Sequence, residues 1–158
     1  VRSDLGAVTL GWDLNHTAAD ELFAAIEGMA MHVRIIIDRI GSGGADCLRI
    51  VNAGGIPQKN AILNQIYADV LDREVFVPSQ SPVGTGSCIF AAAQEALCAA
   101  PRVFRPRASH RAGYDALFAL FSDVYFGFGE GRPVDLGRIL PELRNLRLAG
   151  AAAKGTGA

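Results

Sequence analysis

The feature of the sequence that most constrains its fold is the alternation of two short apolar runs with helical patterns. Leu48–Asn52 is typical of a strand because its centre is β-branched and glycines flank it, and Glu74–Pro78 is typical of a strand that its proline ends. Between these runs, residues 60–71 repeat apolar side chains at helical spacing. A strand, a helix and a second strand in this order predict a parallel pair joined by a crossover helix. The sequence therefore predicts an α/β fold.

Helical patterns also flank this predicted unit. The Thr17–Asp20 segment resembles a capping box, and the apolar residues after it recur every three or four positions until the Gly41–Gly44 run ends the pattern. A helix of small residues is predicted over about 85–100, and a long amphipathic helix rich in aromatic residues over about 109–128. The predicted order is therefore helix, strand, helix, strand, helix, helix.

Two parallel strands do not make a stable sheet by themselves, because both edges stay exposed. We therefore expect earlier residues, a partner chain or an unrecognised strand near Val8–Trp12 to complete the sheet. The chain does not begin with Met, and we interpret it as the C-terminal piece of a longer protein. The sequence around Pro133 and Pro141 is predicted to be loop with one further helical turn, and residues 148–158 to be a disordered tail.

The charge balance and the spacing of charged residues exclude several classes of partner. Fifteen Lys and Arg against sixteen Asp and Glu give a net charge of −1, so a basic surface for nucleic acid is not expected. Charged residues interrupt the apolar stretches well before the roughly 20 residues that span a bilayer. The sequence therefore predicts neither a nucleic-acid partner nor a membrane partner.

The cysteines and histidines show no disulfide or metal-binding spacing. The cysteines are odd in number and contain no CxxC pair, so neither a disulfide framework nor a cysteine zinc site is expected, and the cytoplasm is the expected compartment. No HExxH or related spacing links the histidines, which we interpret as surface or supporting residues. These residues are Cys47, Cys88, Cys98, His16, His32 and His110. A group of arginines near residue 105 is interpreted as a solvated face.

The most informative stretch is the turn after the first predicted strand, Ala53–Asn60. Gly54 and Gly55 lie at the carboxyl end of that strand, where glycine lets a ligand approach the main chain closely. The helix that follows begins with N–H groups suited to a phosphate or a ribose oxygen. The residues alone leave open a second interpretation, in which the glycine pair only makes a tight turn.

Motifs for the familiar nucleotide sites are absent. No GxxxxGK[ST] run occurs, which excludes a P-loop. The segments Gly84-Thr-Gly86 and Gly127-Phe-Gly129 do not complete a GxGxxG between a strand and a helix, so a small Rossmann-type enzyme has little support. No GxSxG elbow supports nucleophilic catalysis by serine.

Several segments together resemble the FGGY family of carbohydrate kinases, and within it the L-ribulokinases. The glycine turn and the helix after it resemble the adenosine motif of that family, and the segments that follow resemble its next strand and its helix of small residues. The resemblance covers residues 6–145, in order and with similar spacing. The segments that carry it are Leu22–Gly28, Ala53–Asn60, Asn64–Val70, Glu74–Pro78, Val83–Ala92 and Pro133–Leu143.

This resemblance implies that residues 1–147 form an incomplete C-terminal domain with an actin-like ATPase (ribonuclease H-like) fold, in which parallel strands alternate with helices. The family transfers the γ-phosphate of MgATP to a sugar hydroxyl, and the implied reaction here converts L-ribulose to L-ribulose 5-phosphate. Gly54 and Gly55 match the glycines whose backbone lies beside the adenosine and the α-phosphate. Gln58 and Asn60 match positions that flank the nucleotide.

The resemblance also implies that the catalytic aspartate, the Mg²⁺ contacts and most sugar contacts lie upstream of the matching segment. Asp13 and Asp20 are therefore not assigned as the catalytic base, and the isolated segment is expected to be inactive. The Met29–His32 run departs from the pattern of the family. Xylulokinase or another FGGY sugar kinase is an alternative, as is a nucleotide-binding module without catalysis. The resemblance is also compatible with a homo-oligomer.

Overall fold

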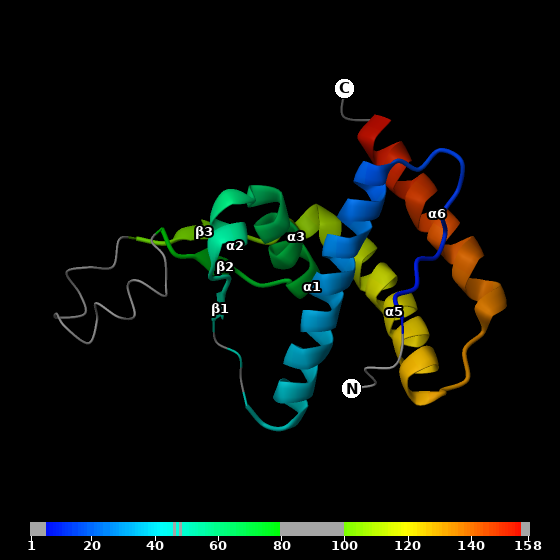
Figure 1. Ribbon diagram of the computed structural model, residues 1–158, viewed down its shortest axis with the longest axis horizontal. Helices are drawn as coiled ribbons and strands as arrows, with labels where there is room; N and C mark the ends of the chain where they lie inside the picture. Colours follow the sequence, from blue (N-terminus) through cyan, green and yellow to red (C-terminus); the bar gives the residue numbers. More distant parts are fainter. Residues whose placement is uncertain (1–5, 46, 48, 80–99, 156–158) are drawn as a thin grey trace. The chain divides into compact units, whose positions relative to one another are not determined.

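The chain divides into two compact units, residues 26–111 and residues 1–25 with 112–158. The computed structural model describes residues 6–45, 47, 49–79 and 100–155, and Figure 1 shows their helices and strands. The helix predicted over 85–100, with Cys88 and Cys98, lies outside the described residues. The two units are described separately below.

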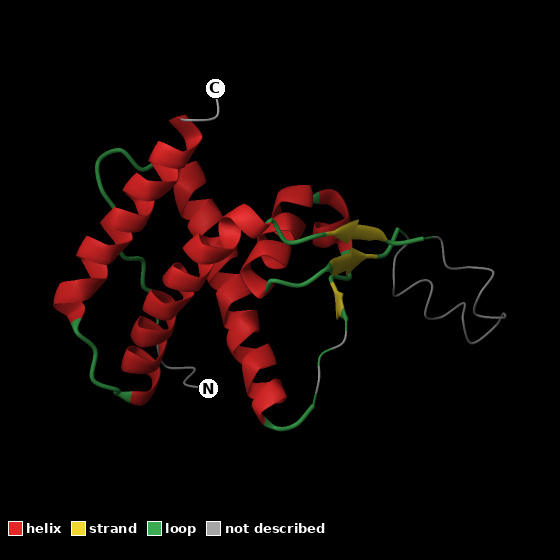
Figure 2. Cartoon of the chain, turned by 180° about the vertical axis from the view of Figure 1, so that it is seen from behind, coloured by secondary structure: helices red, strands yellow, loops and turns green. Residues whose placement is uncertain are grey.

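A three-stranded sheet forms the centre of the unit of residues 26–111. The strands β1 (Ile50–Val51), β2 (Val75–Val77) and β3 (Arg102–Phe104) lie in the order β1-β2-β3. β1 pairs with β2 in parallel, with Ile50 opposite Val75, which confirms the predicted parallel pair. β3 pairs with β2 in antiparallel orientation, as Figure 2 shows from behind.

The strand β3 was not expected from the sequence. It has three residues and lies between Pro101 and the Arg105-Pro106 pair, so it is too short to show an alternating pattern. It pairs with the edge of β2 that lies opposite β1, and the sequence predicted no strand for that edge. The segment at residues 8–12, considered as a possible strand, is not a strand in the structure.

The helices α2 (Gly55–Lys59) and α3 (Ala61–Leu71) form the crossover between the two parallel strands. The helix predicted over residues 60–71 is confirmed as α3. Its Ala68 joins Val75 and Val77 of β2 in a fully buried cluster, because each presents its small or branched side chain to the same interface. Ile50, Tyr67 and Phe104 pack around this cluster, so the core lies between α3 and the sheet. Burial raises the pKa of the Tyr67 hydroxyl.

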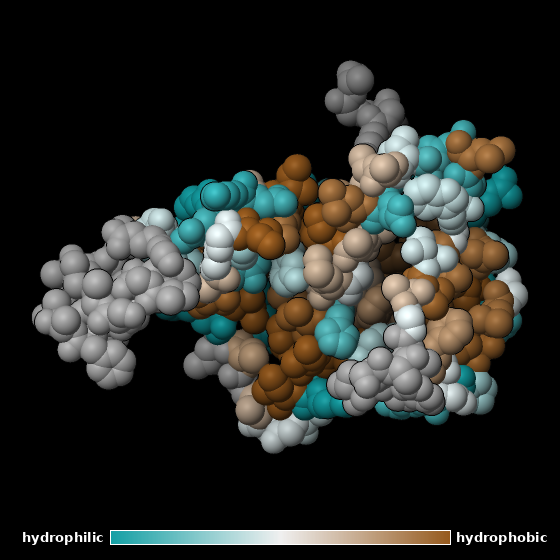
Figure 3. Space-filling view, viewed as in Figure 1, coloured by the Kyte–Doolittle hydropathy of each residue, from teal (hydrophilic) through white to brown (hydrophobic). Residues whose placement is uncertain are grey.

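The helix α1 (Ala18–Ser42) begins with the predicted capping box. The Asp20 carboxylate accepts hydrogen bonds from the backbone N–H of Thr17 at 2.8 Å and from its hydroxyl at 2.6 Å. The helix ends at the glycine run, where Gly44 has a φ of 87°. Its apolar pattern is only partly buried, since Ala30 and Met31 are buried and Ile36 is 45 % exposed. Apolar atoms accordingly appear over α1 in the space-filling view of Figure 3.

Two long helices, α5 (Ala108–Glu130) and α6 (Leu136–Gly155), account for most of the described part of residues 112–158. α5 confirms the predicted aromatic-rich helix. Its Leu120 and the Ile139 side chain of α6 are buried. A Cβ on Gly127 would collide with Val134 Cγ2, so the connection between the two helices passes close to the end of α5.

The prediction of loop around Pro141 was wrong, because this residue lies inside α6. Proline near the start of a helix removes one backbone hydrogen bond, and the leucine, arginine and alanine residues that follow favour helix strongly. The pair of Arg138 Nε and Glu142 Oε1 at 3.2 Å spans one turn across the proline. α6 continues to Gly155, so residues 148–155 are helical where a disordered tail was expected.

Candidate functional site

The glycine turn follows β1 and leads into α2. Gly54 has a φ of 121° and a ψ of 176°, a backbone conformation that in practice only glycine adopts. A Cβ built on Gly54 or on Gly55 would meet nothing within 4 Å. The backbone of this turn is therefore bare among the described residues, and a flat ligand could lie against it.

The backbone conformation requires glycine at position 54 but not at position 55. Gly54 needs its glycine because of the positive φ, which agrees with the tight-turn interpretation. Gly55 has no positive φ and opens α2, and no described residue lies within 4 Å of a Cβ built on it, so an alanine would fit there without strain. The absence of a side chain at Gly55 is therefore not explained by the packing of the described chain.

Gln58 fastens α2 to the sheet. Its Nε2 donates a hydrogen bond to the carbonyl oxygen of Pro78, after β2, at 3.3 Å. Its own carbonyl oxygen accepts a hydrogen bond from the Arg102 guanidinium of β3 at 2.5 Å. The structure thus brings Gln58 into the turn and engages its amide within the fold.

Asn60 is the N-cap of α3. Its Oδ1 accepts a hydrogen bond from the backbone N–H of Leu63 at 3.0 Å, and its own N–H donates to the carbonyl oxygen of Ile56 at 3.0 Å. The four residues expected at the nucleotide, Gly54, Gly55, Gln58 and Asn60, therefore lie in one continuous turn. Contact between these residues and a nucleotide stays a prediction.

Asn64, which the sequence reasoning did not select, lies directly under this turn. The residue is 0 % exposed, and its amide bonds to Asn52, Pro57 and Asn60. A sequence signal existed, because a polar residue on the buried face of an otherwise apolar helix requires hydrogen-bond partners. The partners could not be identified from the sequence, since they come from three different elements.

A second buried polar residue, Asp69, joins α3 to the segment that leads into α5. Its carboxylate accepts hydrogen bonds from the backbone N–H of Arg107 at 2.8 Å and from the Arg107 guanidinium at 2.9 and 2.5 Å. Gln65 Nε2 donates to it at 3.0 Å, and His110 Nδ1 lies 3.3 Å from it. Burial acts to raise the pKa of Asp69, but the hydrogen bonds from Arg107 and Gln65 outweigh it and hold the pKa below its usual value.

The arginines near residue 105, interpreted from the sequence as a solvated face, form specific contacts. Besides Arg107 with Asp69, Arg105 Nε lies 2.8 Å from Glu74 Oε1, and Arg111 pairs with Asp72. All of these acidic partners lie in α3 or just after it. The arginines therefore fasten the sheet and α3 to the start of α5.

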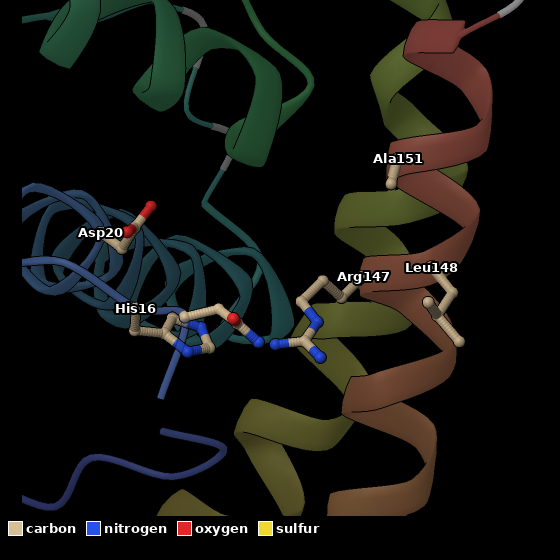
Figure 4. A pocket seen from close by; sticks show the side chains of 6 residues that line it. His16, Asp20, Arg147, Leu148 and Ala151 are labelled. Atoms are coloured by element: carbon tan, nitrogen blue, oxygen red, sulfur yellow. The ribbon is translucent and has the colours of Figure 1, made fainter. Parts of the chain in front are cut away.

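The unit of residues 1–25 and 112–158 contains a separate cavity of about 280 Å³. Figure 4 shows Arg147 of α6 pointing toward His16 across this cavity. Asp13, beside it, accepts hydrogen bonds from Arg147, from the backbone of Asn15 and from His16, and together these lower its pKa to about 2. Since Asp20 caps α1, the charged groups of this cavity are engaged within the chain. Lining residues are Asn15, His16, Asp20, Arg147, Leu148 and Ala151.

Neither a metal cluster nor a membrane helix is found in the described part of the chain. Over residues 6–45, 47, 49–79 and 100–155, no three His, Cys, Asp or Glu side chains gather in a way that could hold a metal ion. Within the same ranges, no helix has both the length and the hydropathy needed to cross a membrane.

The chain is similar to known carbohydrate kinases in both its sequence and its fold. The sequence profile of the FGGY family of carbohydrate kinases, C-terminal domain, matches residues 1–95. The chain is 32 % identical over 169 aligned residues to a ribulokinase of Shouchella clausii, with 96 % of this chain and 30 % of that protein covered. It is 31 % identical over 149 residues to a ribulokinase of Halalkalibacterium halodurans, with 83 % of this chain and 26 % of that protein covered.

A solved structure shares the fold. The crystal structure of xylulose kinase from Rhodospirillum rubrum matches with a TM-score of 0.62 and 24 % identity, covering 73 % of this chain and 26 % of that chain. This likeness confirms the predicted α/β class. The chain spans about 30 % of the length of the curated ribulokinase from Shouchella clausii.

Proposed function

Because the chain belongs to the FGGY family of carbohydrate kinases and carries part of the C-terminal domain of that family, we propose that it forms the nucleotide side of an ATP-dependent sugar kinase. The actin-like ATPase fold of the family agrees with the parallel pair of strands and its helical crossover. The complete enzyme transfers the γ-phosphate of ATP to a sugar hydroxyl. The sugar is L-ribulose, as the names of the curated relatives suggest.

The single observation that carries this proposal is the bare backbone at Gly55. The described part of the chain leaves room for a Cβ there, since none of its atoms lies within 4 Å of one, yet the residue is glycine. A ligand that packs against the main chain explains this choice, because a side chain would occupy the volume of the ligand. The adenosine and α-phosphate of ATP are the groups proposed to lie there, with Gly54 beside them.

Phosphoryl transfer depends mainly on positioning the two substrates and on stabilising the charge of the phosphates. In this scheme the glycine turn holds the adenosine end of ATP, while Gln58 and Asn60 keep α2 and α3 in place around it. Mg²⁺, bound with the nucleotide, supplies charge neutralisation at the phosphates. The catalytic base and the groups that hold Mg²⁺ are expected in other parts of the kinase. The proposed compartment is the cytoplasm.

The test is an ADP-release assay on the protein expressed from its complete open reading frame. We expect ATP turnover that depends on L-ribulose and is several-fold slower with D-xylulose or glycerol at equal concentration. Faster turnover with D-xylulose would assign the alternative sugar. ATP binding by calorimetry without turnover of any of these sugars would favour a nucleotide-binding module without catalysis.

A further inference from the structure

The side-chain amide of Asn64 makes three hydrogen bonds inside the protein. Its Nδ2 donates to the carbonyl oxygen of Pro57 at 2.7 Å and to the carbonyl oxygen of Asn60 at 2.9 Å. Its Oδ1 accepts a hydrogen bond from Asn52 Nδ2 at 3.1 Å. A fully buried amide with both its donor and its acceptor groups engaged has one well-defined orientation.

The three partners of Asn64 lie on both sides of the Gly54-Gly55 pair in the sequence. Asn52 directly follows β1, and its backbone N–H extends the parallel ladder by donating to Phe76 at 3.0 Å. Pro57 lies in α2, and Asn60 caps α3. One side chain therefore connects the strand before the turn, the short helix after it and the start of the next helix.

Apolar packing does little to hold this turn in shape. Gly54 and Gly55 have no side chains to pack, and Ile56 is 69 % exposed. Apolar burial therefore contributes little to the conformation of the segment, and its polar contacts carry most of the restraint. A surface that binds a ligand through its backbone needs such restraint, because a mobile turn would lose conformational entropy on binding.

We propose that Asn64 is a positioning residue for the nucleotide. It touches no ligand itself, and it holds the bare backbone of Gly54 and Gly55 in the conformation that receives ATP. The inference rests on the proposed function and adds to it a residue that controls ATP affinity from beneath the site. Its effect is specific to the nucleotide, because every hydrogen bond of the amide leads to the glycine turn or to its two ends.

The test compares Asn64→Leu, which keeps the branching at Cγ and removes all three hydrogen bonds, with Val70→Ala as the matched control. Val70 lies in the same helix and is equally buried, and its side chain has no hydrogen bond to the turn. Both variants are made in the protein expressed from its complete open reading frame. Steady-state kinetics give kcat and the KM for ATP and for sugar, and hydrogen exchange gives the protection of the backbone amides of residues 54–60.

We expect Asn64→Leu to raise the KM for ATP at least tenfold, with kcat and the sugar KM changed less than threefold. The amides of residues 54–60 should exchange faster in this variant and not in Val70→Ala. An unchanged KM for ATP in folded Asn64→Leu would overturn the inference, as would an equal rise in Val70→Ala. If Asn64→Leu does not fold, Asn52→Ala removes one of the three bonds and should raise the KM for ATP alone; an unchanged value would again overturn the inference.

The two readouts separate this inference from the proposed function. If the wild-type protein neither binds nor turns over ATP, the proposed function fails. The exchange of residues 54–60 then decides by itself whether Asn64 holds the turn. If wild-type protein uses ATP and the exchange of the turn is identical in Asn64→Leu, the inference fails and the proposed function stands.

Discussion

The substitution Gly55→Val should weaken ATP binding while leaving the stability of the fold nearly unchanged. Gly55 lies in α2 without a positive φ, and a Cβ there meets nothing within 4 Å among the described residues, so we expect Gly55→Val to be accommodated in the ligand-free protein. Replacing glycine where the backbone is compatible with a side chain typically stabilises a protein by about 0.4–1 kcal/mol, through the lower entropy of the unfolded chain. Valine forms helix less readily than alanine, so we expect a change in the free energy of unfolding within about 0.5 kcal/mol.

The same valine should obstruct the nucleotide. If adenosine lies against the backbone at this position, the branched side chain takes its place, and the KM for ATP should rise at least tenfold, which is about 1.4 kcal/mol of lost binding. The matched control is Gly113→Val, at another exposed helical glycine with nothing within 4 Å of a built Cβ, which should leave the KM for ATP unchanged. Urea unfolding and the ADP-release assay give the two quantities. A folded Gly55→Val protein with the wild-type KM for ATP would refute the assignment.

Three further predictions concern stability and use urea unfolding. Asp69→Asn should lower the free energy of unfolding by about 2 kcal/mol, because it removes charge-assisted hydrogen bonds to Arg107; equal stability would contradict the role given to this pair. The pKa of Asp69 lies below its usual value in the folded protein, so its contribution is present above its unfolded pKa and is lost as pH falls through the folded pKa. The difference between wild type and Asp69→Asn should therefore shrink below about pH 4, and a difference that does not change with pH would contradict this. Ile36→Ala should change stability by no more than about 0.5 kcal/mol, since Ile36 is 45 % exposed; a loss of 2–5 kcal/mol would mark it as core.

The elements that the sequence predicted are those with a local signal. The capping box at Thr17 and the glycine run after Ile40 mark the two ends of α1, and hydrophobic periodicity marks α3. The short helix α2 lies within the predicted turn, and two further elements that were missed, β3 and α6, depend on other information. β3 forms because it can pair with the free edge of β2. α6 continues through Pro141 because its other residues favour helix. The edge of β2 is not visible in a short window of sequence, and the helix-favouring residues around Pro141 were given less weight than the proline itself.

The candidate site shows the same division. The glycine pair after β1 could be identified from the sequence because glycines at the end of a strand are a local pattern. The roles of Gln58 and Asn60 in fastening α2 and capping α3 required the structure. Asn64 was missed because its importance comes from its partners Asn52, just after β1, and Pro57, in α2, which only the fold brings together.

The most direct test of the central claim is a crystal structure of the protein, expressed from its complete open reading frame, with a non-hydrolysable ATP analogue. We predict that atoms of the adenosine or the α-phosphate lie within van der Waals contact of the backbone of Gly54 and Gly55, with the turn in the conformation described above. An analogue bound at another place, with the turn still facing open space, would contradict the claim that this bare backbone is a nucleotide site.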